Sequence, residues 1–287
     1  MRIPPDVENE VRETPLKIKS SGTHKLSSDL IVRAKQAVRI HADNVDLDLN
    51  GHTVRCLSLY PDTSHESRPR PPIGIDASGH KNVVVRNGTV TSCWCGFQAL
   101  QARDLRLEGV DFSGNLGVGV NLDGAPGAIV RGCTFAKIAG DTYEAYAVGL
   151  NAVGADSVVE CNLFFELYRQ FQIEGPGEGV GVVVKVGKNV IIRHNWFANA
   201  VGRPNTIGIW AGEETDVLVT ENTFTNFERG IASRGNLTVT NNRFLLRDSL
   251  PNSLAVGANG EGVASWNVVD GYATAFNATT HDNIVHS

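Results

Sequence analysis

Apolar and polar residues alternate along most of the chain in a short motif that recurs many times. Its pattern is apolar, any, apolar, polar, any, turn residue, any, apolar. The clearest copies are AIVRGCTF (128–135), SVVECNLF (157–164), VIIRHNWF (190–197), VLVTENTF (217–224) and LTVTNNRF (237–244). Weaker copies are VVVRNGTV (83–90) and LRLEGVDF (105–112), and VDLDLNGHTV (45–54) and ASWNVVDG (264–271) extend the series at either end. Such period-two alternation predicts β-strands with one face inward and one outward.

A second alternation, led by glycine, precedes most copies. Examples are IGIDASG (73–79), GVGVNLDG (117–124), AVGLNAVG (147–154), GVGVVVKVG (179–187) and TIGIWAG (206–212). Each repeat therefore predicts short strands joined by turns, with little room for helices. A repeat this small cannot bury a core alone, so the repeats must stack. We predict an all-β, single-stranded right-handed parallel β-helix of about nine or ten coils with three short strands per coil.

This solenoid is expected to form a single domain. The predicted limits are an N-terminal extension at 1–15, coils at 16–270 and a C-terminal tail or cap at 271–287. Asparagine recurs in the turn slot of the repeat, and we attribute this to its tolerance of left-handed backbone and its ability to bond to the next coil in a ladder. His194 lies one place before this slot and is interpreted as a structural or exposed residue.

Composition narrows the function classes. The 30 glycines of 287 residues suit a chain with many turns. A net charge of −5 without a basic stripe argues against a nucleic-acid partner. No apolar run approaches the roughly 18 residues of a membrane span. The start, MRIPPDVENEVRETP, is not a signal peptide, so the localisation is secreted or periplasmic if a leader was removed and otherwise cytoplasmic. The five cysteines lack zinc-type spacing and favour reduced, buried thiols over a disulfide framework.

The LDLNGHTV entry coil and the repeated V-x-x-N-x-F motif resemble the pectate-lyase-like superfamily of right-handed parallel β-helix proteins. The resemblance covers about residues 16 to 270, nearly the whole chain. It implies the fold, and it implies ligands along the outer face of the Gly-led sheet, walled by variable loops. Members of that superfamily include polysaccharide lyases, uronan epimerases, glycoside hydrolases, esterases and phage tail depolymerases.

The candidate site follows from the outward positions of the Gly-led strands. These are Asp76, Gln98, Asn121, Asp123, Asn151, Lys185, Trp210 and Arg234. With coils about 4.8 Å apart, we expect Asn121, Asn151, Lys185 and Trp210 to line up within about 15 Å. The loops at 136–146 and 165–178 should rise beside them and carry Tyr143, Glu144, Tyr146, Glu166, Tyr168, Arg169 and Glu174.

Cations and tyrosines among amides suit β-elimination or C5 epimerisation of an acidic, uronate-containing polysaccharide. Such chemistry needs a base for the C5 proton, an acid near O4 and a positive group for the uronate carboxylate. We assign Lys185 as the candidate base, Tyr143, Tyr146 or Tyr168 as the acid, and Arg169 or Arg234 as the carboxylate partner. Substrate contacts are expected from Asn121, Asp123, Asn151 and Trp210, whose ring offers a stacking face.

Two alternatives remain open. One is a non-catalytic β-helix that binds poly- or oligosaccharide or assembles with other chains, for example as a homotrimer. The other is a glycoside hydrolase with paired carboxylates, for which Glu144 with Glu166, or Asp76 with Asp123, are the candidate pairs. The NTD, DD and GHG strings of polygalacturonase-like members and the DPHD string of periplasmic alginate epimerases do not occur. No cofactor is predicted with a defined ligand set, although calcium would suit Asp76, Asp123 and the loop glutamates.

Overall fold

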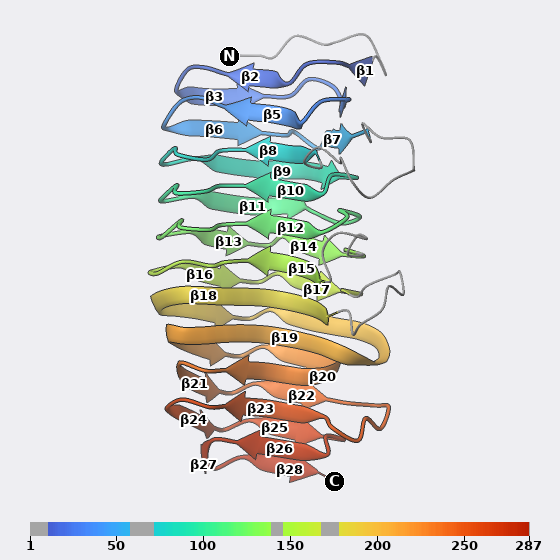
Figure 1. The fold of residues 1–287 in the computed structure, drawn as a ribbon, viewed down its shortest axis with the longest axis vertical. Helices are drawn as coiled ribbons and strands as arrows, with labels where there is room; N and C mark the ends of the chain where they lie inside the picture. The colour runs from blue at the N-terminus through green and yellow to red at the C-terminus, as the bar shows by residue number, and fades with distance from the viewer. Residues whose placement is uncertain (1–10, 58–71, 139–145, 168–177, 287) are drawn as a thin grey trace, which may run out of the picture.

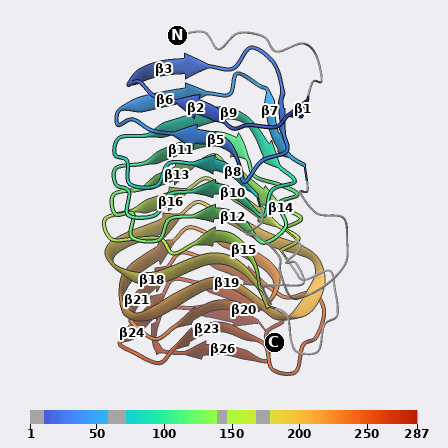
Figure 2. The same ribbon diagram turned by 45° about the horizontal axis from the view of Figure 1, so that its top comes forward.

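The computed structural model describes residues 11–57, 72–138, 146–167 and 178–286. Across these residues the regular structure is entirely β, and the strands pair in parallel as one 28-stranded system. Figures 1 and 2 show the coils stacked along the long axis, with the first described strands at one end and the last at the other. In the described part of the chain, no helix is long and apolar enough to cross a membrane. The predicted parallel β-helix is confirmed.

Each coil contributes strands to three stacked sheets. The Gly-led sheet contains β2 (Leu16–Ile18), β5 (Gln36–Ile40), β8 (Ile73–Asp76), β10 (Cys95–Gln98), β12 (Val118–Asn121), β15 (Tyr146–Asn151), the start of β18 (Glu178–Arg193), the middle of β19 (Trp196–Thr220), the end of β20 (Thr223–Ser233), β23 (Leu254–Ala258) and β26 (Thr274–Asn277).

The second sheet contains β3 (Gly22–Lys25), β6 (Val45–Asp48), the starts of β9 (Val84–Thr91) and β11 (Arg106–Asp111), β13 (Ile129–Arg131), β16 (Val158–Glu160), the ends of β18 and β19, β21 (Asn236–Thr240), β24 (Gly262–Ser265) and β27 (Thr279–His281). The third sheet contains β1 (Val11–Arg12), β4 (Leu30–Val32), β7 (Thr53–Cys56), the ends of β9 and β11, β14 (Thr134–Ala136), β17 (Leu163–Phe165), the starts of β19 and β20, β22 (Arg243–Leu245), β25 (Val268–Asp270) and β28 (Ile284–His286).

The coils extend beyond the predicted limits. Strands β26, β27 and β28 form a further coil within 271–287, the stretch that the sequence pattern predicted to be a tail or cap. At the other end, β1 lies before the predicted first coil at residue 16. The sequence THDNIVH (280–286), which spans the end of β27, a turn and β28, hides the last repeat because its alternation is weak.

A stack of phenylalanine rings runs through the core. Phe135, Phe164, Phe197, Phe224 and Phe244 are fully buried, and successive ring centroids are 4.6 to 4.8 Å apart with nearly parallel planes. This spacing matches the separation of adjacent strands in a sheet. Each ring is the final apolar residue of one copy of the repeat motif, so the repeat stacks its aromatic residues in a column.

The glycines that lead the first sheet are required by this stack. A Cβ on Gly208 would lie 2.5 Å from the carbonyl oxygen of Gly230 and 2.6 Å from Cδ1 of Phe224. Gly149 and Gly181 face equivalent rings at 2.8 and 2.7 Å. None of the three has a positive φ, so close packing, not turn geometry, excludes a side chain there. The sequence interpretation of glycine as a turn residue was therefore incomplete.

The predicted asparagine ladder is present, but its backbone explanation was wrong. In each rung the side-chain Oδ1 accepts the backbone N–H of the equivalent residue in the preceding coil, as Asn222 does for Asn195 at 2.9 Å and Asn162 does for Cys133 at 2.8 Å. The left-handed residue is the one before the ladder, with φ near +55° at Cys161, His194 and Glu221. The ladder asparagines are buried, and their positions require the amide group rather than a left-handed backbone.

The cysteine prediction was wrong in part. Cys56 and Cys93 form a disulfide that joins β7 to the segment before β10, which is 37 residues along the chain. Cys95 and Cys133 are buried free thiols, and burial raises the pKa of both, that of Cys133 to about 12. Cys161 is a free and exposed thiol. The pairing depends on two turns meeting at one corner, which residue spacing alone does not reveal.

Candidate functional site

The outer face of the Gly-led sheet carries one in-register row of side chains, here called the outer row. Paired strands place Asp76, Gln98, Asn121 and Asn151 in successive coils. Leu150 pairs with Val182, and Val183 pairs with Trp210, so Val183 and Trp210 continue the row. The row is therefore Asp76, Gln98, Asn121, Asn151, Val183 and Trp210.

Polar contacts hold the first half of the outer row. Nδ2 of Asn151 donates to Oδ1 of Asn121 at 3.1 Å, so these amides bond across the coils. The carboxylate of Asp76 accepts from Nε2 of Gln36 at 2.6 Å and from Oγ of Ser78 at 2.6 Å. Asp76 is buried and both its oxygens are engaged. Because its oxygens are used within the protein, Asp76 stabilises the row. The amides of the row are then the hydrogen-bonding groups that a ligand can reach.

A parallel apolar row flanks these amides. Cys95, Val118, Val148, Val180 and Ile207 are paired in register and form a cluster separate from the core. Trp94, Trp210 and Ala232 pack against this cluster and are partly buried. The five residues of this row are themselves buried, so the accessible apolar surface beside the amides comes from the partly exposed indoles of Trp94 and Trp210. Hydrogen-bonding groups beside apolar faces are what a polyhydroxylated ring can contact on its edge and its face.

Cations lie near both ends of the outer row. Arg39 pairs with Asp76 in the register, and Lys17 pairs with Arg39, so both extend the row toward the N-terminus. Desolvation, with the charges of Arg39 and Lys17, lowers the pKa of the nearby His41. Near the other end, Arg229 follows Ile207 in the flanking row and is exposed. Lys17, Arg39 and Arg229 were not among the predicted residues, although continuing the register of the strands in both directions would have found them.

The structure corrects the position of Lys185. The side chain is exposed, as expected from the cost of burying a charge. However, Val183 is the residue that lies between Asn151 and Trp210 in the row. Lys185 lies two residues farther along β18, at the corner where the register between β18 and β19 shifts. The expected line-up of Lys185 with Asn121, Asn151 and Trp210 was therefore wrong.

Of the other predicted residues, some have side chains that the structure describes, and the rest do not. Arg234 is exposed at the same corner as Lys185, with its Nη1 3.7 Å from Oε1 of Glu213. Asp123 is exposed in the turn after β12, where its carbonyl oxygen accepts the N–H of Gln101. Tyr146 begins β15, but its side chain is not described. Tyr168 and Arg169 lie outside the described residues, as do Tyr143, Glu144 and Glu174.

Two of the carboxylates proposed for hydrolysis, Asp76 and Glu166, are occupied by contacts within the protein. Oε1 of Glu166 accepts the N–H of Ala200 at 2.6 Å, and its Oε2 lies 3.5 Å from Arg203. Glu166 is buried and holds the start of β19 in place. Among the described residues, no group of three or more His, Cys, Asp and Glu side chains is arranged to hold a metal ion.

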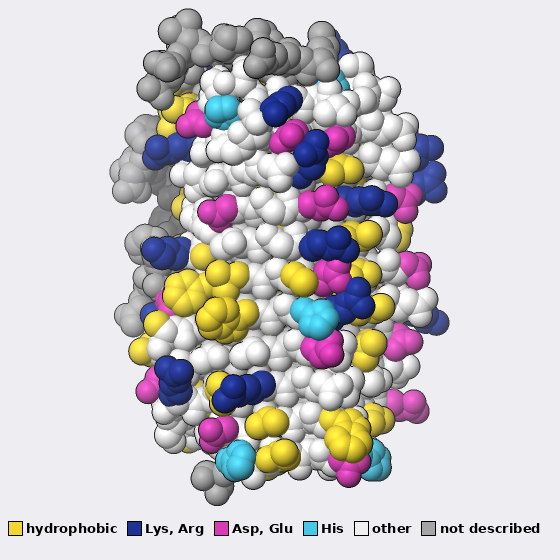
Figure 3. Space-filling model, turned by 180° about the vertical axis from the view of Figure 1, so that it is seen from behind, with side chains coloured by type: hydrophobic (Ala, Val, Ile, Leu, Met, Phe, Trp, Pro, Cys, Tyr) yellow, Lys and Arg dark blue, Asp and Glu magenta, His cyan; other side chains and the backbone are white. Residues whose placement is uncertain are grey.

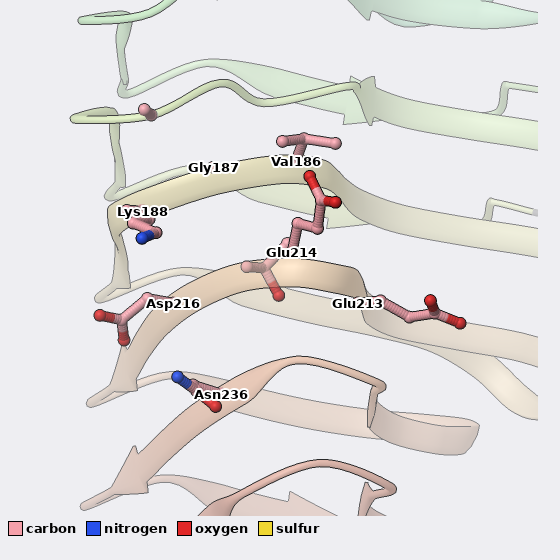
Figure 4. A pocket seen from close by; sticks show the side chains of 9 residues that line it. Val186, Gly187, Lys188, Glu213, Glu214, Asp216 and Asn236 are labelled. Atoms are coloured by element: carbon pink, nitrogen blue, oxygen red, sulfur yellow. The ribbon is translucent and has the colours of Figure 1, made fainter.

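A hollow of about 650 Å³ opens at the corner between the Gly-led and second sheets. Figure 4 shows its side chains pointing outward from neighbouring coils, with Val186 and Lys188 on β18 and Glu213, Glu214 and Asp216 on β19. The bulge that displaces Lys185 also creates this hollow. The hollow carries three carboxylates and one lysine, so its net charge is negative. It is therefore unsuited to binding a polyanion.

The outer face of the second sheet has a different character. Glu160 bonds to Nε of both Arg131 (2.6 Å) and Arg193 (2.8 Å), and Arg86 pairs with Asp46 and Asp48. The hydrogen bonds from Arg193 and Arg131 lower the pKa of Glu160. Figure 3 shows cationic and anionic side chains interleaved along the back of the molecule. Since these charges are satisfied by one another, this face offers little to a charged ligand.

Comparison with known proteins agrees with this architecture. A family model described as a right-handed beta helix region matches residues 70–199. Among solved structures, the DFA-IIIase of Arthrobacter chlorophenolicus A6 is 13% identical, with a TM-score of 0.59 over 95% of this chain and 74% of that one. The alginate lyase of Paenibacillus sp. str. FPU-7 is 14% identical, with a TM-score of 0.59 over 92% of each chain.

A third similar structure is the tailspike of E. coli bacteriophage HK620, in complex with a pentasaccharide. It is 10% identical, with a TM-score of 0.64 over 93% of this chain and 56% of that chain. No curated protein matches the sequence. Identities this low establish the fold alone. The chain is a right-handed parallel β-helix protein.

Proposed function

We propose that the protein binds an acidic polysaccharide along the outer face of the Gly-led sheet. The observation that carries this proposal is the outer row itself, in which bonded amides lead in register to Trp210. Amides can bond sugar hydroxyls, and the indole can stack on a ring face. Lys17 and Arg39 near one end of the row and Arg229 near the other supply positive charge for carboxylates.

We further propose that the protein is a carbohydrate-active enzyme that acts on a uronate by β-elimination or C5 epimerisation. Two of the similar solved structures, a DFA-IIIase and an alginate lyase, are named as enzymes, and the second acts on a uronate polymer by its name. In this proposal Tyr146 or Tyr168 is the acid and Arg169 the carboxylate partner. Lys185 remains the candidate base, and it would act on a sugar at the corner end of the row.

A non-catalytic glycan-binding function is the second candidate, and one observation favours it. The described part of the row offers amides, a valine and an indole, while Lys185 and Arg234 lie at the corner beside the acidic hollow. A surface without a base at its centre can bind a polymer without cleaving it. The tailspike in complex with a pentasaccharide is a β-helix neighbour whose name reports glycan binding.

Incubation with a panel of uronans and neutral polysaccharides separates these functions. A lyase generates an unsaturated product that absorbs near about 235 nm, whereas an epimerase changes the proton NMR spectrum without that absorbance. A binding protein is retarded by the polymer in affinity electrophoresis and changes neither the absorbance nor the NMR spectrum of the polymer. Retardation by neutral polymers alone would contradict the acidic substrate, and the absence of retardation by every polymer would contradict the proposed face.

A further inference from the structure

Three reactive side chains occupy equivalent positions on successive coils at the corner between the second and third sheets. Cys161, His194 and Glu221 each have a left-handed backbone, and each directly precedes an asparagine of the ladder. The N–H of Cys161 donates to the carbonyl of Arg193, and the N–H of His194 donates to that of Thr220, which fixes the stacking. We call these three residues the corner row.

The corner row is open to solvent. Cys161 is an exposed free thiol, and the side chains of His194 and Glu221 are each 49% exposed. On the other side of Cys161, the equivalent position is Gly132, which also has a left-handed backbone and no side chain. A reagent can therefore approach the sulfur of Cys161 from that side without displacing a neighbouring side chain.

The imidazole of His194 is oriented by the carboxylate below it. Its Nε2 lies 3.0 Å from Oε2 of Glu221, so Nε2 carries the proton that bonds to the carboxylate. The two nitrogens of an imidazole point in nearly opposite directions. Nδ1 is the nitrogen that this bond leaves unused, and Cys161 occupies the equivalent position of the preceding coil, about 4.8 Å along the stack. Thiol, imidazole and carboxylate thus follow one another in the order used to activate a nucleophile.

We propose that Cys161 is a thiol-modification site that reacts with low-molecular-weight disulfides such as glutathione disulfide. Nδ1 of His194 takes the thiol proton, and the sulfur of Cys161 attacks one sulfur of the reagent. The reagent's S–S bond breaks, a mixed disulfide forms, and the leaving thiolate accepts the proton from the imidazole. The exchange needs no other oxidant. Glu221 acts as a positioning residue because it orients the ring without touching the reagent.

The charged groups around the corner row belong to the neighbouring strands. Arg131 on β13 and Arg193 on β18 both bond to Glu160, which directly precedes Cys161. These groups form a closed ion-pair network, so Glu221 is the anion that acts directly on His194. The corner row lies away from the Gly-led sheet, and its reactivity is independent of polysaccharide binding.

The test follows thiolate release from a chromogenic aromatic disulfide added to the folded protein. Cys161→Ser should abolish rapid release, because Cys95 and Cys133 are buried. His194→Asn keeps a residue that tolerates left-handed backbone and should slow the reaction at neutral pH by at least about tenfold, a modest value for acid–base assistance because the site is wet. The difference should vanish at alkaline pH, where the thiol ionises without help.

Glu221→Gln should give an intermediate rate. Asn241→Gly, which changes the next position of the same corner, should react as the wild type does. Thermal unfolding of each variant confirms that the solenoid is intact. Rapid release from Cys161→Ser would show that another thiol reacts. Equal rates for wild type and His194→Asn at neutral pH, with both folded, would overturn the role of the imidazole.

Discussion

Removal of one ladder amide, in Asn222→Ala, should destabilise the solenoid more than its size suggests. Asn222 is 1% exposed. Its Oδ1 accepts the backbone N–H of Asn195 at 2.9 Å and the side-chain amide of the same residue at 3.0 Å. Its Nδ2 donates to the carbonyl of Ile192 at 2.9 Å. Alanine would leave a buried N–H and a buried carbonyl without these partners.

The magnitude follows from those orphaned groups. A buried donor or acceptor left without a partner costs about 1–3 kcal/mol. With the backbone N–H of Asn195 and the carbonyl of Ile192 both affected, the free energy of unfolding should fall by about 3–5 kcal/mol. Thr223→Ala is the matched control. It truncates the adjacent, partly exposed side chain and leaves the backbone bond to Asn195 intact, so it should cost at most about 1 kcal/mol.

Denaturant-induced unfolding followed by circular dichroism measures both variants. The wild type and Thr223→Ala should unfold at similar denaturant concentrations, and Asn222→Ala at a clearly lower one. A loss of less than about 1 kcal/mol for Asn222→Ala would refute the reasoning, because it would mean that the ladder amides are replaced by solvent at little cost.

Three further predictions concern other parts of the solenoid. Gly208→Ala should cost about 1–3 kcal/mol because the new Cβ would meet the carbonyl of Gly230 and the ring of Phe224, and thermal unfolding measures it. Glu160 has a lowered pKa, so the stability it confers is complete above the ordinary carboxyl pKa and is lost as pH falls through the lowered folded value. The melting temperature of wild type should thus fall more steeply than that of Glu160→Gln below about pH 4, and parallel curves would contradict this. Replacing Cys56 and Cys93 by serine should lower the free energy of unfolding by about 2–4 kcal/mol, with reductant giving the same shift in wild type only.

The fold could be predicted from the sequence because its signals are local and repeated. The alternation of each strand, the final phenylalanine of each repeat and the ladder asparagine all recur with every coil. The role of Gly208 and its counterparts could not be predicted, because it depends on a ring that arrives from a different sheet. The Cys56–Cys93 disulfide was missed for a similar reason, since turns from different coils meet there.

The sheet face that carries the site could be predicted from the sequence, but the register of all its strands could not. Asn121 and Asn151 were correctly aligned because their strands alternate plainly. In β18, valine fills almost every position from 180 to 186, which hides the alternation, and a bulge beyond Val184 shifts the pairing. Lys185 was therefore predicted correctly to point outward, but its expected place in the outer row was wrong. His194 was predicted to be a structural or exposed residue, and it is half exposed at the left-handed position before the ladder.

The most direct test of the outer row is the affinity of Trp210→Ala for an acidic polysaccharide that the wild type binds. Trp196→Ala is the matched control, because Trp196 is 57% exposed on the third sheet and lies away from the row. Affinity electrophoresis should show at least about tenfold weaker binding for Trp210→Ala, as expected for the loss of an aromatic stacking contact, and unchanged binding for Trp196→Ala. Equal affinities for wild type and Trp210→Ala, or a loss confined to Trp196→Ala, would contradict the proposed face.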